Sequence, residues 1–448
     1  MNQRWTLHVE NFERIESADI EIAPLMCFIG DNNSGKSYVM SLLWGIMAKG
    51  YILFHRLLEH PYKTDNFKNC TEWLSKNIGK TVEITDDVEK MHIEWFNELL
   101  SIHKHELLKN IFNHEMNISK IEIRNFSRLK KLSVQIHDLD SERFTGYTSK
   151  KDSIFLEMHL KLAPLENYSF ILCWCLLMKG LIDINRSLLN DYAPVYLPAS
   201  RTGFLLTRRD IVNKAVRKMF SFASTEDVFQ EKLTAPYIQF LEMINNLKDS
   251  SDVYAEEKIP LINFMQNEII HGDVTVSSDG KIIRYNPEDN IRKELPLSIT
   301  SSVVTETASL LLLLNNYCPL QLIIIEEPEA HLHPALQKKI AQLLIRFVHS
   351  GAPIWITTHS ETILQHFNNM IKLNNRTSEV RSELLEKFSY TNDDLLNPEE
   401  INLYQFDRSE KQTIIKKLES NKYGFVVPSF NKAIDKLMSE IFAFQEEE

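Results

Sequence analysis

The sequence has 448 residues, of which 44% are hydrophobic and 25% are charged, and its formal net charge is −11. This length predicts two or three domains with sizeable cores. The acidic balance excludes a surface that is basic as a whole, so a nucleic-acid contact requires a local basic patch. The chain has five cysteines, which is an odd number, and most of them lie in apolar runs. Both features favour reduced thiols in the cytoplasm. Because no leader or membrane-spanning run is evident, we expect no membrane partner.

The first motif lies between a predicted strand and a predicted helix. Residues 5–22 alternate loosely between apolar and polar side chains, which predicts two antiparallel strands. Residues 25–29 predict a third, buried strand, and residues 38–48 predict an apolar helix. The sequence between them matches the phosphate-binding loop pattern GxxxxGKS in the context that this pattern requires. Its residues are Gly30, Asp31, Asn32, Asn33, Ser34, Gly35, Lys36 and Ser37.

The residue types of this loop suit a nucleoside triphosphate. Gly30 and Gly35 let the backbone N–H groups turn toward phosphate oxygens, and the following helix adds its dipole. Lys36 offers a positive charge to the β- and γ-phosphates, and Ser37 offers a hydroxyl to Mg²⁺. The sequence therefore predicts a site for a nucleotide together with Mg²⁺.

Basic residues gather in the middle of the chain, after helical sequence at 51–115 and predicted strands at 121–136 and 153–160. Arg201 follows a short predicted strand, in a position typical of ligand contacts or of a structural salt bridge. Downstream, a predicted helix carries five cations against a single acid. We keep two interpretations, a solvated helix face and a patch for nucleic acid or a partner protein. The patch would comprise Arg201, Arg208, Arg209, Lys214, Arg217 and Lys218.

Polar residues end two buried strands of the second half. The predicted strand at 322–325 ends in Glu326 and Glu327, and the strand at 353–357 is followed by His359. Paired acids at the tip of a buried strand are costly unless a cation or ligand uses them. Since ligands collect at the carboxyl edge of such sheets, we predict an ATPase site there. Glu326 would hold Mg²⁺ directly or through water, Glu327 would act on the attacking water, and His359 would reach the γ-phosphate.

Several motifs together resemble the ABC-type ATPases of the RecF, SMC and OLD group, and the single-chain AAA-family ATPases of anti-phage systems such as Septu and PARIS. The resemblance implies an α/β ABC-ATPase head with a mixed sheet, an antiparallel subdomain and helical insertions. The N-terminal lobe would comprise residues 1–50 and 116–203, and the C-terminal lobe 259–375. Residues 51–115 and 204–258 would be insertions, and 376–448 an extension of a hairpin and a helix. The motifs are Asn11-Phe12, GDNNSGKS, Ser301-Ser302, IEEPEAHLHP at 325–334 and TTHS at 357–360.

The same resemblance implies self-association. In a homodimer of heads, or a higher homo-oligomer, Ser301 and Ser302 of one subunit would contact the ATP bound by the other. Val303 stands where the family has glycine, and Glu326 where it has aspartate, so we expect slow hydrolysis.

The implied role is a sensor or regulatory subunit of an anti-phage system that controls a partner effector nuclease or toxin. One alternative is a RecF- or SMC-like DNA-binding ATPase of repair or maintenance. Another is a chain that binds ATP structurally and scarcely hydrolyses it. We find no nuclease motif in this chain.

Overall fold

The computed structural model describes most of the chain, and all structural statements below concern the described part. It comprises residues 3–50, 53, 64–128, 131–137, 146–149, 153–159, 165–179, 194–219, 233–247, 258–277, 280, 282–288, 293–316, 322–421, 423–428, 438–442 and 444. Side chains at 146–149, 153–159, 165–168, 178–179 and 212–219 are outside the description.

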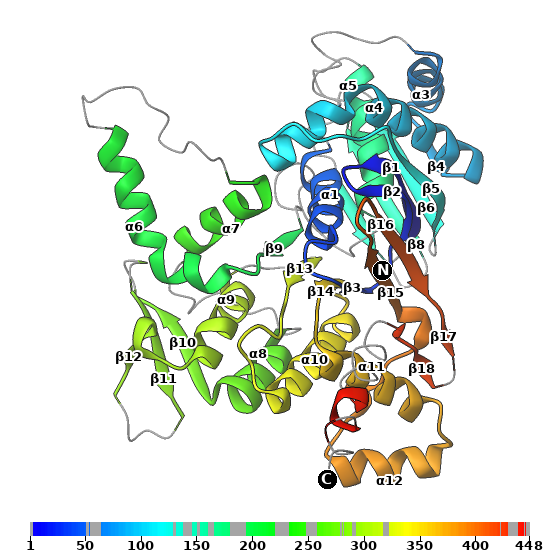
Figure 1. Cartoon of the computed structure of the whole chain (residues 1–448). Helices are drawn as coiled ribbons and strands as arrows, with labels where there is room; N and C mark the ends of the chain where they lie inside the picture. The colour runs from blue at the N-terminus through cyan, green and yellow to red at the C-terminus, as the bar shows by residue number, and fades with distance from the viewer. Residues whose placement is uncertain are drawn as a thin grey trace.

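A nine-stranded mixed sheet forms the centre of the molecule (Figure 1). Strands β15, β3, β14, β13 and β9 are parallel neighbours, whereas β5, β1 and β2 form an antiparallel part. The predicted α/β fold with a mixed sheet and an antiparallel part is therefore confirmed. In spatial order the strands are β5 (Lys120–Arg128), β1 (Gln3–Phe12), β2 (Ile15–Glu21), β16 (Thr413–Leu418), β15 (Ile401–Arg408), β3 (Leu25–Gly30), β14 (Ile354–Thr357), β13 (Ile323–Glu326) and β9 (Val195–Leu197).

The central parallel strands β3, β13 and β14 are mainly apolar, as is typical of strands with both faces covered. Every residue of β3, β13 and β14 is buried. Successive side chains of a strand point to opposite faces, so Cys27 and Ile29 join one core while Met26 and Phe28 join the other. Helices α8 (Ile259–Met265), α9 (Ser302–Asn316), α10 (Pro334–His349) and α11 (Glu361–Asn374) contribute to the first core; α1 (Lys36–Lys49) and α4 (Asp86–Phe112) contribute to the second.

Smaller sheets and further helices surround this centre. A four-stranded sheet contains β4 (Thr81–Glu83), β6 (Lys131–His137), β8 (Ser153–His159) and β7 (Gly146–Ser149). A three-stranded sheet contains β10 (Gly272–Val276), β11 (Ile283–Pro287) and β12 (Leu295–Pro296), and β17 (Ser420–Asn421) pairs with β18 (Gly424–Phe425). The remaining α-helices are α3 (Asp65–Lys76), α5 (Leu165–Trp174), α6 (Arg201–Met219), α7 (Ala235–Asn245) and α12 (Ser378–Phe388). None of the helices in the described ranges has the length and apolarity that crossing a membrane requires.

The late hairpin of the chain lies inside the central sheet. Its first strand, β15, runs parallel to β3, and its second, β16, is antiparallel to β15. The first six residues of β15 are all buried, which requires cover on both faces. A Cβ atom on Gly30 would meet the Phe406 carbonyl oxygen at 2.2 Å, and Gly30 has a φ of +131°. Only glycine fits there, so a strand close to the end of the chain shapes the start of the phosphate loop.

Candidate active site

The loop after β3 has the features of a phosphate cradle. Gly35 has a φ of +96° and precedes α1, whose N-terminus receives no side-chain capping hydrogen bond. The Ser34 hydroxyl is buried and has no partner within the described part of the chain. A helix start with uncapped N–H groups and an unsatisfied buried hydroxyl suits an oxyanion, so the residues fit the phosphates of a nucleotide.

Lys36 lies at the inner side of this loop. Its ammonium is buried and donates to the carbonyl oxygens of Gly30 at 2.9 Å and Asp31 at 2.8 Å. Burial lowers the pKa of Lys36, and the charge of Glu327 is the largest effect that opposes this. The loop backbone therefore holds the lysine in place, and the negative charges of the acids at the end of β13 favour its protonated form.

The two acids at the end of β13 have different surroundings. The Glu326 carboxylate is buried and accepts from the Tyr196 hydroxyl at 2.9 Å, the Ala199 N–H at 3.0 Å and the Tyr237 hydroxyl at 3.4 Å. The Glu327 side chain is 43% exposed, and its carboxylate lies 3.9 Å from His359 Nε2. Glu326 therefore holds neighbouring elements together, whereas Glu327 is free to act on a substrate.

Two of the partners of Glu326 are tyrosines, which no sequence pattern singles out. Burial, followed by the Glu326 charge, raises the pKa of Tyr196 far above its usual range. The same two causes raise the pKa of Tyr237 to about 12. Both hydroxyls thus stay protonated and donate to the carboxylate. For Mg²⁺ this leaves the exposed Ser37 hydroxyl as the ligand that fits best, since both Glu326 oxygens are already engaged.

His359 follows β14 and faces the same edge as Glu327, since β13 and β14 are parallel and pair Glu326 with Thr357. Burial, followed by the Lys36 charge, lowers the pKa of His359. The imidazole is therefore neutral near pH 7 and carries one N–H to donate. The predicted loop, acid pair and histidine thus lie together at the carboxyl edge of the sheet.

Glu329 is a residue of this site that sequence reasoning missed. Its carboxylate accepts from the Thr358 hydroxyl at 2.6 Å and the His359 N–H at 2.7 Å. Burial raises the pKa of Glu329. Its second oxygen is buried without a partner in the described ranges. Glu329 therefore fixes the turn that presents His359; the only sequence signal was a further acid shortly after the pair.

The predicted basic patch is wrong in two of its six residues. Arg201 and Arg208 are 3% and 4% exposed. Arg208 donates to the carbonyl oxygens of Ile244 and Gly280, so its guanidinium is used for contacts inside the protein and not for a ligand at the surface. Arg209 is exposed, as expected. The other three lie on α6, with side chains outside the described residues, so the prediction for them stays untested: Lys214, Arg217 and Lys218.

Arg201 connects the end of β13 to α9. Its guanidinium donates to the carbonyl oxygens of Glu326 at 2.7 Å and Glu327 at 3.1 Å, and it lies 3.3 Å from the Glu306 carboxylate. Glu306 in turn is 2.8 Å from His331 Nδ1. The structural salt bridge that the sequence left open for Arg201 is thus present, and it fixes the backbone of both acids.

Ser301 precedes α9 directly and Ser302 is its first residue, so both belong to a different element from the phosphate loop, the β13 acids and His359. Both side chains are exposed, and the helix runs from Ser302 to Asn316. Val303 is half-buried and packs against the core, which explains an apolar residue where the resemblance expected glycine. Because Glu306 lies on the same helix, the salt bridge to Arg201 joins this exposed helix start to the acids of β13.

The chain was compared with curated proteins and with solved structures. No curated protein matches the chain. Similar solved structures include the SMC head domain from Thermotoga maritima, at 10% identity and a TM-score of 0.35, covering 94% of this chain and 100% of that one. Another is an Smc head domain with an extended coiled coil, bound to the C-terminal domain of ScpA, derived from Pyrococcus furiosus, at 9% identity and a TM-score of 0.36, covering 98% and 100%.

A family model described as the AAA ATPase domain matches residues 6–114 and 206–364. These ranges contain the phosphate loop, the serines that begin α9, the β13 acids and His359. Since the match covers more than half of the sequence, the chain belongs to the AAA ATPase domain family.

Proposed function

We propose that this chain binds ATP with Mg²⁺ at the phosphate loop and hydrolyses it slowly when two copies close on each other. The observation that carries this proposal is the gathering of Lys36, Glu327 and His359 at one sheet edge. When bound, Mg²⁺ supplies positive charge that neutralises the phosphates. Ser37 would hold the ion, with Glu326 contributing through water.

The residues of the chain divide the remaining work. Lys36 attracts the β- and γ-phosphates. Glu327, which is partly exposed, orients the attacking water and accepts its proton. Neutral His359 donates a hydrogen bond toward the γ-phosphate, and Glu329 holds its backbone. Arg201 acts as a positioning residue, because it fixes the carbonyl groups on both sides of the Glu326–Glu327 peptide bond.

The second half of the site would come from another subunit. Ser301 and Ser302 are exposed at the start of a helix, where hydroxyls and N–H groups suit a γ-phosphate. When the start of α9 contacts the ATP of the other subunit, the buried Arg201–Glu306 pair couples that contact to the position of Glu326 and Glu327. Val303 and the engaged carboxylate of Glu326 both favour a site that holds ATP longer than it hydrolyses it.

For the biological role we propose a sensor or regulatory subunit of an anti-phage system, which controls a partner effector nuclease or toxin in the cytoplasm. The motif resemblance supports this role. The burial of Arg201 and Arg208 supports it too, because it leaves fewer cations on the surface for DNA. A RecF- or SMC-like ATPase that acts on DNA is the alternative, and exposed Arg209 favours it. Duplex binding with a steep salt dependence would support the alternative.

The catalytic assignment is tested with Glu327→Gln, which removes the base and keeps the size of the side chain. We expect phosphate release to fall about 100-fold or more while ATP affinity stays within about threefold. Glu379→Gln, a change at an exposed acid of α12, is the matched control and should match wild type. Equal phosphate release by wild type and Glu327→Gln would show that Glu327 is not the base.

The composite site is tested by light scattering of Glu327→Gln at a fixed protein concentration, where we expect ATP to form a dimer of heads and so raise the mean mass above that of the same protein without nucleotide. Ser302→Arg should abolish that dimer and leave ATP binding to the monomer intact, because the side chain is exposed.

The biological role is tested by a plaque assay with the neighbouring genes. Protection should be lost with Lys36→Ala; unchanged protection would contradict a nucleotide-gated sensor.

A further inference from the structure

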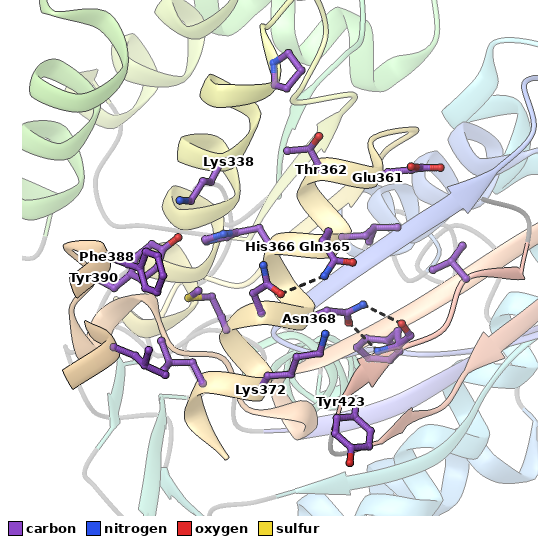
Figure 2. Close-up of a pocket in the computed structure, with 18 of the residues that line it drawn as sticks. Lys338, Glu361, Thr362, Gln365, His366, Asn368, Lys372, Phe388, Tyr390 and Tyr423 are labelled. Carbon is purple, nitrogen blue, oxygen red and sulfur yellow. Dashed lines mark hydrogen bonds between the residues drawn. The ribbon is translucent and has the colours of Figure 1, made fainter. Parts of the chain in front are cut away.

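A groove of about 990 Å³ lies between α10, α11, α12 and the β17–β18 turn (Figure 2). It begins at the N-terminal residues of two helices, since Pro334 and Ala335 of α10 and Glu361 and Thr362 of α11 line it. These helices follow the β13 acids and His359 directly. The groove is therefore separate from the nucleotide site, yet it borders the helices that support that site.

The groove has an apolar floor and an exposed aromatic rim. Leu364, Met370 and Leu373 on α11 are buried and line it. Phe388 and Tyr423 also line it and are 54% and 61% exposed. Large apolar side chains that remain in solvent around a hollow are typical of a site that binds another apolar surface.

The charges of the groove are mostly positive. Lys338, Lys372 and Arg376 line it, whereas Glu361 is the only acid among its described lining residues. Within the described ranges none of the three cations forms an ion pair, and Lys338 Nζ lies 5.0 Å from the centre of the Tyr390 ring. In a chain with a net charge of −11, this local excess of positive charge favours an anionic ligand.

One buried side chain of the groove has an unused hydrogen-bonding atom. His366 is 3% exposed, and its Nε2 has no partner in the part of the chain that the structure describes. Burial lowers the pKa of His366 to about 4, so the ring is neutral at physiological pH. Figure 2 shows His366 among the lining side chains, between those of Lys338 and Asn368. A ligand that hydrogen-bonds to this nitrogen would satisfy a buried polar atom.

The ligand chemistry points to a peptide segment rather than a nucleotide. The floor is apolar, and the N-terminus of α11 is already capped by the Ser360 hydroxyl and flanked by the Glu361 carboxylate, which would repel a phosphate. A segment with aromatic side chains between carboxylates matches both the floor and the cations.

The chain itself contains such a segment. Residues 438–448 read MSEIFAFQEEE, with four glutamates and no cation. Ile441, Phe442 and Phe444 are 39%, 57% and 81% exposed, so much of their apolar surface is left uncovered in this chain's own fold.

We propose that the groove binds segment 438–448 of a second copy of the chain. The aromatic side chains lie over the apolar floor, and the glutamates lie near Lys338, Lys372 and Arg376. Such a contact is heterologous, because two different surfaces meet, so it joins chains head to tail. It does not depend on ATP hydrolysis, and it adds a second self-association surface to the dimer proposed above.

The test uses a fluorescent peptide of residues 438–448 and the full chain carrying Phe442→Ala and Phe444→Ala, which removes competition by the chain's own segment. We expect saturable binding by anisotropy. The groove variant Lys372→Glu with Arg376→Glu, in the same background, should weaken binding at least tenfold. A peptide with both phenylalanines replaced by alanine should fail to bind, and Lys109→Glu, an exposed change on α4, should leave binding unchanged.

Light scattering of the otherwise unmodified chain then identifies the source of the segment. We expect the mean mass to rise with concentration, without nucleotide, and this rise to be lost with Phe442→Ala and Phe444→Ala. Three results would overturn the proposal: no peptide binding, binding that the groove variant leaves unchanged, or displacement of the peptide by ATP or a dinucleotide. A mass that stays constant while the peptide binds would place the segment in its own groove and overturn the second-copy assignment.

Discussion

The phosphate-loop edge and the groove beside α11 both attract anions, but they are built from charges in opposite environments. At the edge, the ammonium of Lys36 and the guanidinium of Arg201 are buried; the ammonium donates to two carbonyl groups and the guanidinium to four. In the groove, Lys338 and Arg376 extend from exposed positions above apolar and aromatic side chains.

The difference between buried and exposed charges indicates which kind of ligand each region can recognise. Buried charges with several partners cannot move, so they select a ligand by geometry, as a phosphate group requires. Exposed charges on long side chains adapt to their ligand and are screened by salt, so they suit an extended acidic segment. Loss of a charge at the edge should therefore reduce the stability of the fold or the affinity for phosphate, whereas loss of a charge in the groove should reduce only the affinity for the peptide.

The largest expected effect comes from Arg201→Met. It removes the cation beside the buried Glu306 carboxylate and one donor to each of the carbonyl groups of Glu326 and Glu327, so unfolding free energy should fall by about 3–5 kcal/mol. Arg209→Met, at an exposed position of the same helix, should change it by less than about 0.5 kcal/mol. Chemical denaturation compares the two; equal midpoints would mean that the Arg201 pair contributes nothing to the fold.

Lys36→Ala should give the next largest effect. ATP affinity is expected to fall about 100-fold, because a buried charge loses its contact with the phosphates. Isothermal calorimetry measures this, with Lys49→Ala in the last turn of α1 as control. Retained ATP affinity in Lys36→Ala would contradict the role of the loop.

A pH-dependent effect of intermediate size is expected from His366. Its folded pKa of about 4 lies below the unfolded value near 6.5, so the unfolded chain binds more protons between these values. Stability is therefore fully present above pH 6.5 and falls until about pH 4. Burial causes the low pKa, Lys338 and Lys339 add to it, and Asp394 opposes it.

The corresponding measurement is urea unfolding at pH 7 and pH 5. Between these values wild type should lose about 2 kcal/mol more than His366→Gln. His92 is buried with a pKa also lowered to about 4, so it contributes equally to both proteins and cancels in the comparison. An identical loss in the two proteins would show that His366 is not buried in the neutral form.

The smallest effect separates the two regions by salt. Raising the salt concentration from about 50 to 500 mM should weaken binding of the 438–448 peptide about tenfold, because exposed charges are screened. Binding of ATP should weaken less, since Lys36 is buried. Anisotropy with each labelled ligand measures both slopes, and equal slopes would remove the distinction between buried and exposed charges.

Much of the central sheet and of the candidate site could be predicted from short stretches of the sequence. Apolar runs predicted β3, β13 and β14, and the spacing of Gly30, Gly35 and Lys36 predicted the phosphate loop. These signals are local, because a loop between a buried strand and a helix needs its residues at fixed spacing. The order of strands in a parallel sheet then placed the acids and His359 at one edge.

Only the tertiary structure decided how the charged residues are used. For Arg201 the sequence left a ligand contact and a structural salt bridge open, and for Arg208 a solvated face or a binding patch. In the structure carbonyl groups of distant segments surround both, and Arg201 donates to Glu326, which is 125 positions away. Likewise, Glu326 and Glu327 are adjacent in sequence, yet one is buried among tyrosines and the other faces solvent. A charge has the same sequence signal whether exposed or buried, and its environment depends on which distant backbone groups the fold brings near it.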